Sequence, residues 1–257
     1  MRTRILILLP VALLLLLAPG RARAWSKESQ IQIAWEAARL GPPDLYRQIV
    51  RHKLRYRDGL LAPYANAAAE YHEKNGDGTG QLDEVILAET ERAIYYIRAH
   101  YPFADIVEQL GVLLHYVNDA NNPLQTSSAD PAESGYHQDY LSYIRSAEPR
   151  FAAAYYGLDT RLDDLKALPD FVDRTITRSR RLYPYIGNEY RRIGEQSGVD
   201  AFDDRSTAFG VAAVSFSRAL TDAVAVLRFV WLEAGGGDPV ARAPLAADKL
   251  VKVPRIH

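Results

Sequence analysis

The stretch LLHYVNDANNPLQ, residues 113–125, holds the residues with the clearest potential for chemistry in this chain. His115 and Asp119 stand four residues apart in an otherwise apolar segment. One helical turn separates them, so their side chains lie on the same face of a helix. An imidazole beside a carboxylate forms either a buried hydrogen-bonded pair or part of a metal site. Further ligands elsewhere in the chain decide between these two readings.

Four other positions carry groups that bind hard or borderline cations: Trp25, Asp58, His72 and His137. Trp25 counts only if processing makes it the N-terminal residue, because its backbone amine is then free. Each position taken alone has an ordinary structural explanation, and so does a His-x-x-x-Asp spacing. Their occurrence together with His115 and Asp119 favours a metal site.

The elements that must position these residues are helical almost throughout. Ser26 is a suitable N-cap for the first helix, whose inward stripe we expect to be Ile31, Ala34, Trp35 and Ala38. Residues 73–81 have the Asn, Asp and Gly content of a loop. The pattern predicts helical segments over 26–40, 43–58, 62–72, 82–100, 103–118, 136–146, 163–196 with a break near 183–185, and 203–234. The fold class is all-α, a single multi-helix domain.

The first 24 residues have the pattern of a secretory signal peptide. Arg2 and Arg4 precede an apolar run over 5–18, and Ala22-Arg23-Ala24 matches a small-x-small cleavage site. Cleavage after Ala24 would make Trp25 the mature N-terminus, in a secreted or periplasmic protein. The expected domain then covers residues 25–237, followed by an irregular, proline-containing tail over 238–257.

Composition limits the classes of partner. The signal segment removes four arginines and no acids, which leaves 27 basic and 32 acidic residues and a formal charge of −5. A binder of duplex nucleic acid normally shows a basic surface, so we expect no duplex partner. The chain has no cysteine, so no disulfide framework supports it.

These residues, in this order, resemble the zinc-dependent bacterial phospholipase C family, whose fold is shared with single-strand-specific zinc nucleases. In that family a processed N-terminal tryptophan binds zinc through its free amine and carbonyl, as Trp25 would. The segment around His115 and Asp119 resembles the family's central segment. Asp58 and His72 have the spacing of its first carboxylate and second histidine, and GYHQDY (135–140) resembles the segment with a late histidine.

The resemblance implies zinc ligands at Trp25, Asp58, His72, His115, Asp119 and His137. Three zinc ions are bound in the family, but this chain departs from its pattern. SQIQIAWEAARL lacks the early histidine, Gln125 replaces the histidine of Pro-x-His, and Leu141 replaces a glutamate. Asp58, His72, His115 and Asp119 still form one complete set of two nitrogen and two oxygen ligands, which suits zinc. We therefore expect one retained metal, a second without its imidazole, and a lost third.

Residues 73–84, EKNGDGTGQLDE, partly resemble a calcium-binding EF-hand loop. The first position is Glu73 where Asp is usual, and Gly80 stands where a branched apolar residue is usual. A solvated turn fits these residues better than a Ca²⁺ site does.

The activity implied by the resemblance is hydrolysis of a phosphodiester, most of all a phospholipid, with any peripheral membrane contact shallow. Zinc lowers the pKa of a water molecule and withdraws charge from phosphoryl oxygens, and Asp58 would ligate the metal or act as the base. Two alternatives stay open at this point. One is a single-strand nuclease-like enzyme, and the other is a non-catalytic helical relative with one structural metal or none.

Overall fold

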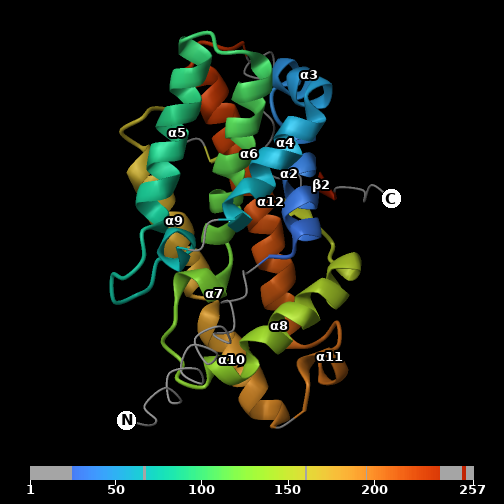
Figure 1. The fold of residues 1–257 in the computed structure, drawn as a ribbon. Coiled ribbons are helices and arrows are strands. Elements are labelled where there is room, and N and C mark those ends of the chain that lie inside the picture. The colour runs from blue at the N-terminus through green and yellow to red at the C-terminus, as the bar shows by residue number, and fades with distance from the viewer. Residues whose placement is uncertain (1–24, 66–67, 160, 195, 238–250, 253–257) are drawn as a thin grey trace, which may run out of the picture.

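The computed structural model describes residues 25–65, 68–159, 161–194, 196–237 and 251–252. Within them the chain is an elongated bundle of helices, and the all-α expectation is confirmed (Figure 1). The longer helices are α2 (Lys27–Leu40), α3 (Pro43–Arg51), α4 (Lys53–Leu61), α5 (Leu82–Arg98), α6 (Phe103–Ala120), α8 (Glu133–Ala147), α9 (Leu168–Arg180), α10 (Tyr183–Ile193) and α12 (Thr207–Glu233). Short turns are η2 (Ala62–Ala65), η3 (Ala69–His72), α7 (Pro123–Thr126), η4 (Glu148–Arg150) and α11 (Gly198–Ala201).

Helices α6 and α12 form the centre of the bundle (Figure 1). Both are apolar nearly all round, as a helix surrounded by others must be. Ser206 caps α12 by accepting the amide of Phe209. By length and composition α12 is also able to cross a membrane, but 78% of its apolar window is buried inside the molecule. Its burial accounts for its composition.

Helices α4 and α6 cross with their backbones closer together than side chains at the crossing point would allow. Gly59 lies against the backbone of Glu108, and Gly111 lies against the backbone of Tyr56 and Leu60. A Cβ atom on Gly111 would come within 2.7 Å of the Leu60 nitrogen and nearer still to the Tyr56 carbonyl. The two glycines therefore allow the helix backbones to touch, and they bring Leu60 next to the second half of α6.

Three local expectations differ from the structure. The helix expected over 43–58 is interrupted at His52, which separates α3 from α4. The helix expected over 62–72 consists of the two 3₁₀ turns η2 and η3. Helix α2 turns Gln30, Ile33 and Ala37 inward, whereas the expected stripe members Ile31 and Trp35 are only partly buried.

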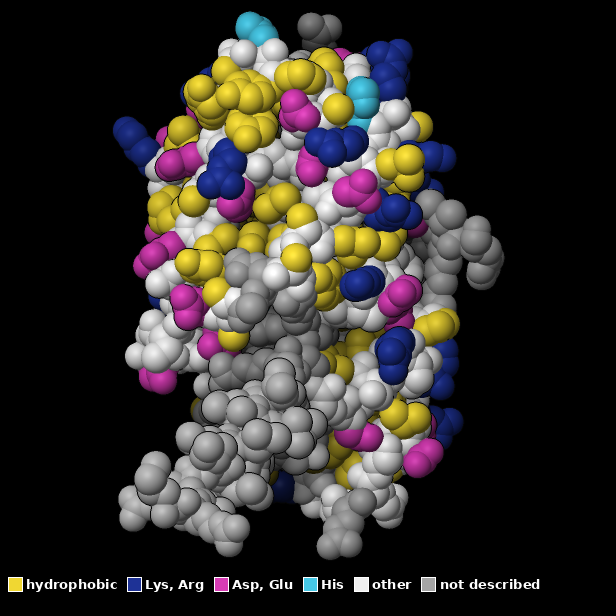
Figure 2. All heavy atoms as spheres, in the orientation of Figure 1, with side chains coloured by type: hydrophobic (Ala, Val, Ile, Leu, Met, Phe, Trp, Pro, Cys, Tyr) yellow, Lys and Arg dark blue, Asp and Glu magenta, His cyan; other side chains and the backbone are white. Residues whose placement is uncertain are grey.

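The signal peptide expected over 1–24 lies outside the described residues, and so does most of the expected tail. Val251–Lys252 (β2) is described, and it pairs antiparallel with Ala154–Tyr155 (β1). At the upper end of the view in Figure 2, hydrophobic side chains gather on the surface. Exposed aromatic residues at the turn between α5 and α6 are Tyr95, Tyr101 and Phe103.

Candidate metal centre

Three of the expected ligands converge in the interior of the bundle. His72 ends η3, whereas His115 and Asp119 lie on the last two turns of α6. One ligand atom from each residue lies within 4.8 Å of the other two, close enough for a single ion to contact all three. All three side chains are buried, with 1–5% of their surface exposed. Among the described residues, this is the group of histidines and acids with the geometry of a metal site.

The orientation of His115 is fixed by the backbone of α4. Its Nδ1 lies 2.8 Å from the Leu60 carbonyl oxygen, which can only accept a hydrogen bond, so Nδ1 carries the proton. In a neutral ring Nε2 then presents a lone pair. That Nε2 is buried without a hydrogen-bond partner in the described part of the chain, and it faces Asp119 Oδ2 at 3.3 Å. Two lone pairs facing each other require a cation between them, either a proton or a metal ion.

Asp119 is the common partner of both imidazoles. Its Oδ2 lies 2.8 Å from His72 Nδ1 as well as 3.3 Å from His115 Nε2. Burial raises the pKa of the Asp119 carboxyl, but the two neighbouring imidazoles outweigh burial, and the pKa lies below its usual range. Asp119 is thus an anion at the negative end of α6, where a neighbouring positive charge is favourable.

Gln30 occupies the other oxygen of Asp119. Its Nε2 donates to Asp119 Oδ1 at 3.1 Å, and its Oε1 accepts from Asn118 Nδ2 at 2.6 Å. The sequence showed this glutamine only as part of a segment without a histidine. One signal was available: a glutamine with no capping role, one turn before the buried Ala34, is a candidate for a buried hydrogen bond.

Trp25 lies beside this network and is 2% exposed. Its indole N–H donates to the Asn118 carbonyl at 2.9 Å, and its own carbonyl accepts from Tyr64 OH at 2.7 Å. The Tyr64 ring in turn stands edge-on to His115, with ring centroids 4.8 Å apart. Trp25 is therefore held next to the cluster, while metal binding by its processed amine stays a prediction.

Asp58 differs from expectation. The sequence suggested it as the fourth ligand and as the catalytic carboxylate, but its side chain is 52% exposed and lies 3.5 Å from Arg57. Helix α4 packs against α6 through Gly59 and Leu60, so Asp58 falls on the outward face of the helix. The set of four ligands expected from the sequence reduces in the structure to His72, His115 and Asp119.

His137 also lies outside the cluster. It pairs with Glu133, one turn earlier on α8, with Nδ1 2.8 Å from Oε1. The other Glu133 oxygen accepts a hydrogen bond from Tyr183. Among the described residues, no third histidine or acid lies close enough to this pair to complete a metal site.

The loop over 73–81 is closed by its own hydrogen bonds. Asp77 Oδ1 accepts from the Thr79 amide at 2.9 Å and from its hydroxyl at 2.7 Å, and these bonds lower the Asp77 pKa. These contacts are internal to the loop, and Ca²⁺ binding by residues 73–84 is not tested by them.

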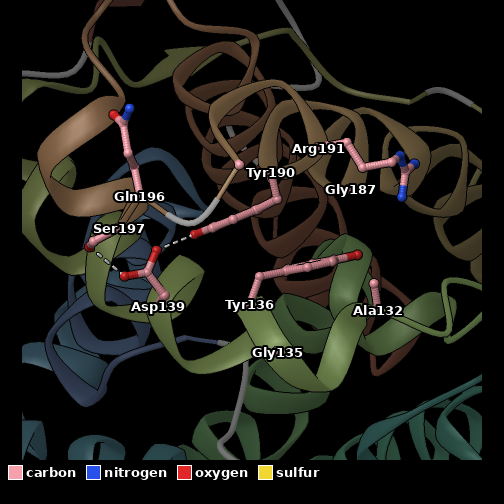
Figure 3. Close-up of a pocket in the computed structure, with 10 residues that line it drawn as sticks. Ala132, Gly135, Tyr136, Asp139, Gly187, Tyr190, Arg191, Gln196 and Ser197 are labelled. Atoms are coloured by element: carbon pink, nitrogen blue, oxygen red, sulfur yellow. Dashed lines mark hydrogen bonds between the residues drawn. The ribbon is translucent and has the colours of Figure 1, made fainter.

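A cavity of about 490 Å³ lies between α8, α10 and the loop before α11 (Figure 3). Tyr136 and Tyr190 stack along it, with ring centroids 4.6 Å apart. Asp139 Oδ1 accepts from Ser197, and its Oδ2 accepts from Tyr190 OH and the Gly198 amide, each at 2.6 Å. These bonds tie the loop to α8, and they leave the carboxylate little capacity for a ligand.

Comparison with solved structures finds the same arrangement of helices elsewhere. Clostridium perfringens alpha-toxin from an avian strain superposes with a TM-score of 0.61 and 13% sequence identity, over 85% of this chain and 66% of that one. The fold is that of the alpha-toxins. The Clostridium absonum alpha-toxin gives a TM-score of 0.57 at 14% identity, again over 85% of this chain and 66% of that one.

Both neighbours are of the zinc phospholipase C type that the sequence resembles. This chain spans less than two thirds of the length of either toxin. Neither protein-family models nor curated proteins give a match to the sequence. At 13–14% sequence identity the comparison establishes the fold alone. Any activity must be argued from the geometry of His72, His115 and Asp119.

Proposed function

We propose that this protein is an exported, zinc-dependent phosphodiester hydrolase of the phospholipase C type, with a reduced metal site formed by His72, His115 and Asp119. The observation that supports this most directly is the buried Nε2 of His115, which faces Asp119 without a hydrogen-bond partner among the described residues. Two nitrogens and one carboxylate oxygen are a donor set that zinc prefers. The alpha-toxin fold supplies the link to phosphodiester chemistry.

The number of ligands is also informative. Catalytic zinc sites hold the ion with three protein ligands and leave one position for water or substrate, whereas structural sites are closed by four. Asp58 faces outward, so the cluster has three side-chain ligands. Zinc bound there would activate water and withdraw charge from the phosphoryl oxygens.

The residues of the chain itself have separable tasks. The Leu60 carbonyl fixes the tautomer of His115, which directs Nε2 at the shared point. Asp119 supplies the negative charge that offsets the cation. Gln30 holds the second Asp119 oxygen in place.

The test combines metal analysis with an assay on a soluble phosphocholine ester. The processed protein should contain about one zinc per chain, as expected for a single cluster with zinc-type donors. It should release phosphocholine, and His115→Ala should lose both properties. Asp58→Asn should retain zinc, because Asp58 lies outside the cluster. Zinc content below about half an equivalent per chain, in protein supplied with zinc, would refute the proposal, because a cluster with zinc-type donors should bind about one ion.

One observation favours a second function. The three ligands are buried and Gln30 is bonded to Asp119, an arrangement that also suits a metal or proton with a purely structural role. In that non-catalytic relative, Asp119→Ala would lower the melting temperature, and no lipid or nucleotide diester would be hydrolysed by either protein.

A further inference from the structure

A second cavity, of about 470 Å³, lies against α9 and is lined largely by arginines. Arg174, Arg178 and Arg181 follow one another at intervals of four and three residues, so they lie on one face of this helix and its C-terminal end. Arg161, from the loop before α9, joins them in the lining. None of these residues belongs to the metal cluster or to its hydrogen-bond network.

The charges around the cavity do not balance. The charged side chains in its lining are four arginines and two aspartates, Asp159 and Asp173. Asp159 is already committed, because it binds Arg161 through both oxygens at 2.8 and 2.9 Å. Like charges at i and i+4 on a helix repel each other. The lining therefore carries more positive than negative charge. Asp159 is paired with Arg161 and offsets little of the charge on the α9 arginines.

Several guanidinium N–H groups also lack a hydrogen-bond partner among the described residues. Arg174 Nε and Nη2 and Arg178 Nε are buried without a hydrogen bond in the described part of the chain. Arg174 lies 3.6 Å from Asp159, which is an ion-pair distance but too long for a hydrogen bond. Each guanidinium carries five donors in a fixed plane, so these arginines retain unused capacity.

The wall behind Arg178 contains one further acid and one further arginine. Arg178 is held by the buried Asp222, whose pKa burial raises above its usual value despite the contact. Arg218 stands near Arg178, and burial together with the Arg178 charge lowers its pKa. An anion in the cavity would relieve the repulsion among these guanidinium groups.

We propose that this arginine-lined cavity binds a phosphoryl dianion. A tetrahedral dianion offers several acceptor oxygens to guanidinium groups that approach from different sides, and arginine forms paired hydrogen bonds with phosphate. Arg161 is paired with Asp159 and Arg178 with Asp222, so Arg174 and Arg181 are the arginines left to balance the charge of the anion. The phosphoryl group belongs to inorganic phosphate, to a soluble phosphate monoester or to an anionic lipid head group, and the test separates these sources.

The experiment is calorimetric titration of the full zinc-loaded protein at constant ionic strength. The probes are sodium phosphate, glycerol phosphate, and vesicles of phosphatidylcholine with and without phosphatidic acid. Saturable binding of phosphate or glycerol phosphate is expected, and the tighter of the two identifies free phosphate or a monoester as the source. The double variant Arg174→Gln/Arg181→Gln should weaken this binding by roughly tenfold or more, since two charge-assisted contacts are lost.

Arg145→Gln is the matched control, because Arg145 is an exposed arginine on α8, away from this cavity. Arg178 is left intact, since its removal would leave Asp222 as a buried unpaired acid. If the double variant does not fold, the single variant Arg181→Gln, at an exposed position, gives the same readout.

Three results would overturn the proposal: no saturable binding of any probe by the unaltered chain, equal affinity in the arginine variants, or equal loss in Arg145→Gln. Binding to the phosphatidic acid vesicles alone, lost in the arginine variants, would identify the lipid head group as the source. Phosphate binding that disappears on chelation yet persists in Arg174→Gln/Arg181→Gln would assign the anion to the metal cluster instead. That last result would leave the proposed hydrolase in place, so the two proposals fail separately.

Discussion

Two histidine sites in this molecule show how differently an imidazole and a carboxylate can be brought together. On α8, His137 and Glu133 are one turn apart in the same helix, and their pairing needs nothing beyond that helix. At the end of α6, Asp119 meets His115 from its own helix and His72 from a separate turn, while α4 fixes the ring. The pair on α8 is local, whereas the cluster on α6 depends on tertiary packing.

The difference also explains why only one of the two regions has the geometry for a metal. A local pair supplies two ligands, and a second helix must contribute a third for an ion to be held firmly. Tyr183 reaches Glu133 from α10, but a tyrosine hydroxyl at neutral pH is a poor substitute for an imidazole. Among the described residues, the geometry that could hold a metal ion therefore lies at the α6 end.

The largest expected effect is at Asp119. Asp119→Asn should lower zinc affinity more than about 100-fold, because loss of outer-shell partners alone costs about 10–100-fold. Zinc titration against a competing chelator measures this. Glu133→Gln on α8 is the matched control and should leave the affinity unchanged. Equal losses in both variants would remove the distinction between the two regions.

The next effect tests the packing that supports the cluster. Gly111→Ala should destabilise the fold by about 1–3 kcal/mol or more, because the added methyl meets the backbone of α4. Zinc affinity should fall as well, since the Leu60 carbonyl moves away from His115. Gly135→Ala on α8 has open space around its Cβ, so it should be neutral or stabilising within about 1 kcal/mol. Urea unfolding of both variants gives the comparison.

A smaller effect is expected at Gln30. Gln30→Leu leaves Asp119 Oδ1 and the Asn118 amide without their partners, which should cost about 1–3 kcal/mol of the free energy of unfolding. Gln32→Leu, on the outer side of the same helix, should cost less. If the two variants were equally stable, Gln30 would have no supporting role in the cluster.

The smallest effect is expected on α8 itself. His137→Gln removes a partly exposed pair within one helix, and such pairs contribute less than about 1 kcal/mol. Zinc content and phosphodiester hydrolysis should both be retained. A loss of zinc in His137→Gln would show that this region binds metal after all.

Much of the fold and the centre of the site were predictable from the sequence. The spacing of His115 and Asp119 specifies one helix face, and the resemblance adds His72, so these three residues were found together. Asp58 was misplaced, because its direction depends on where α4 begins, and the break at His52 carries no proline or glycine. The face that a helix turns inward is fixed by its neighbours, and sequence spacing alone does not determine it.

Gln30 and the α9 arginines were missed for a related reason. From sequence alone, Gln30 is expected at the surface, because the buried Asp119 carboxylate that it binds is known only from the structure. Arg174, Arg178 and Arg181 have visible helical spacing, but a solvated basic face has the same pattern. The structure adds what the spacing does not show, namely that these arginines line a cavity together with Asp159 and Arg161.

The crossing at Gly59 and Gly111 has a consequence for how this protein can change over time. Where two peptide backbones touch directly, their separation is independent of the volume of nearby side chains. Leucines, isoleucines and valines around the crossing are then free to exchange for one another without redirecting the imidazole of His115. A sequence could diverge far from its relatives and still keep the orientation of the His115 ring, provided that Gly59 and Gly111 are retained.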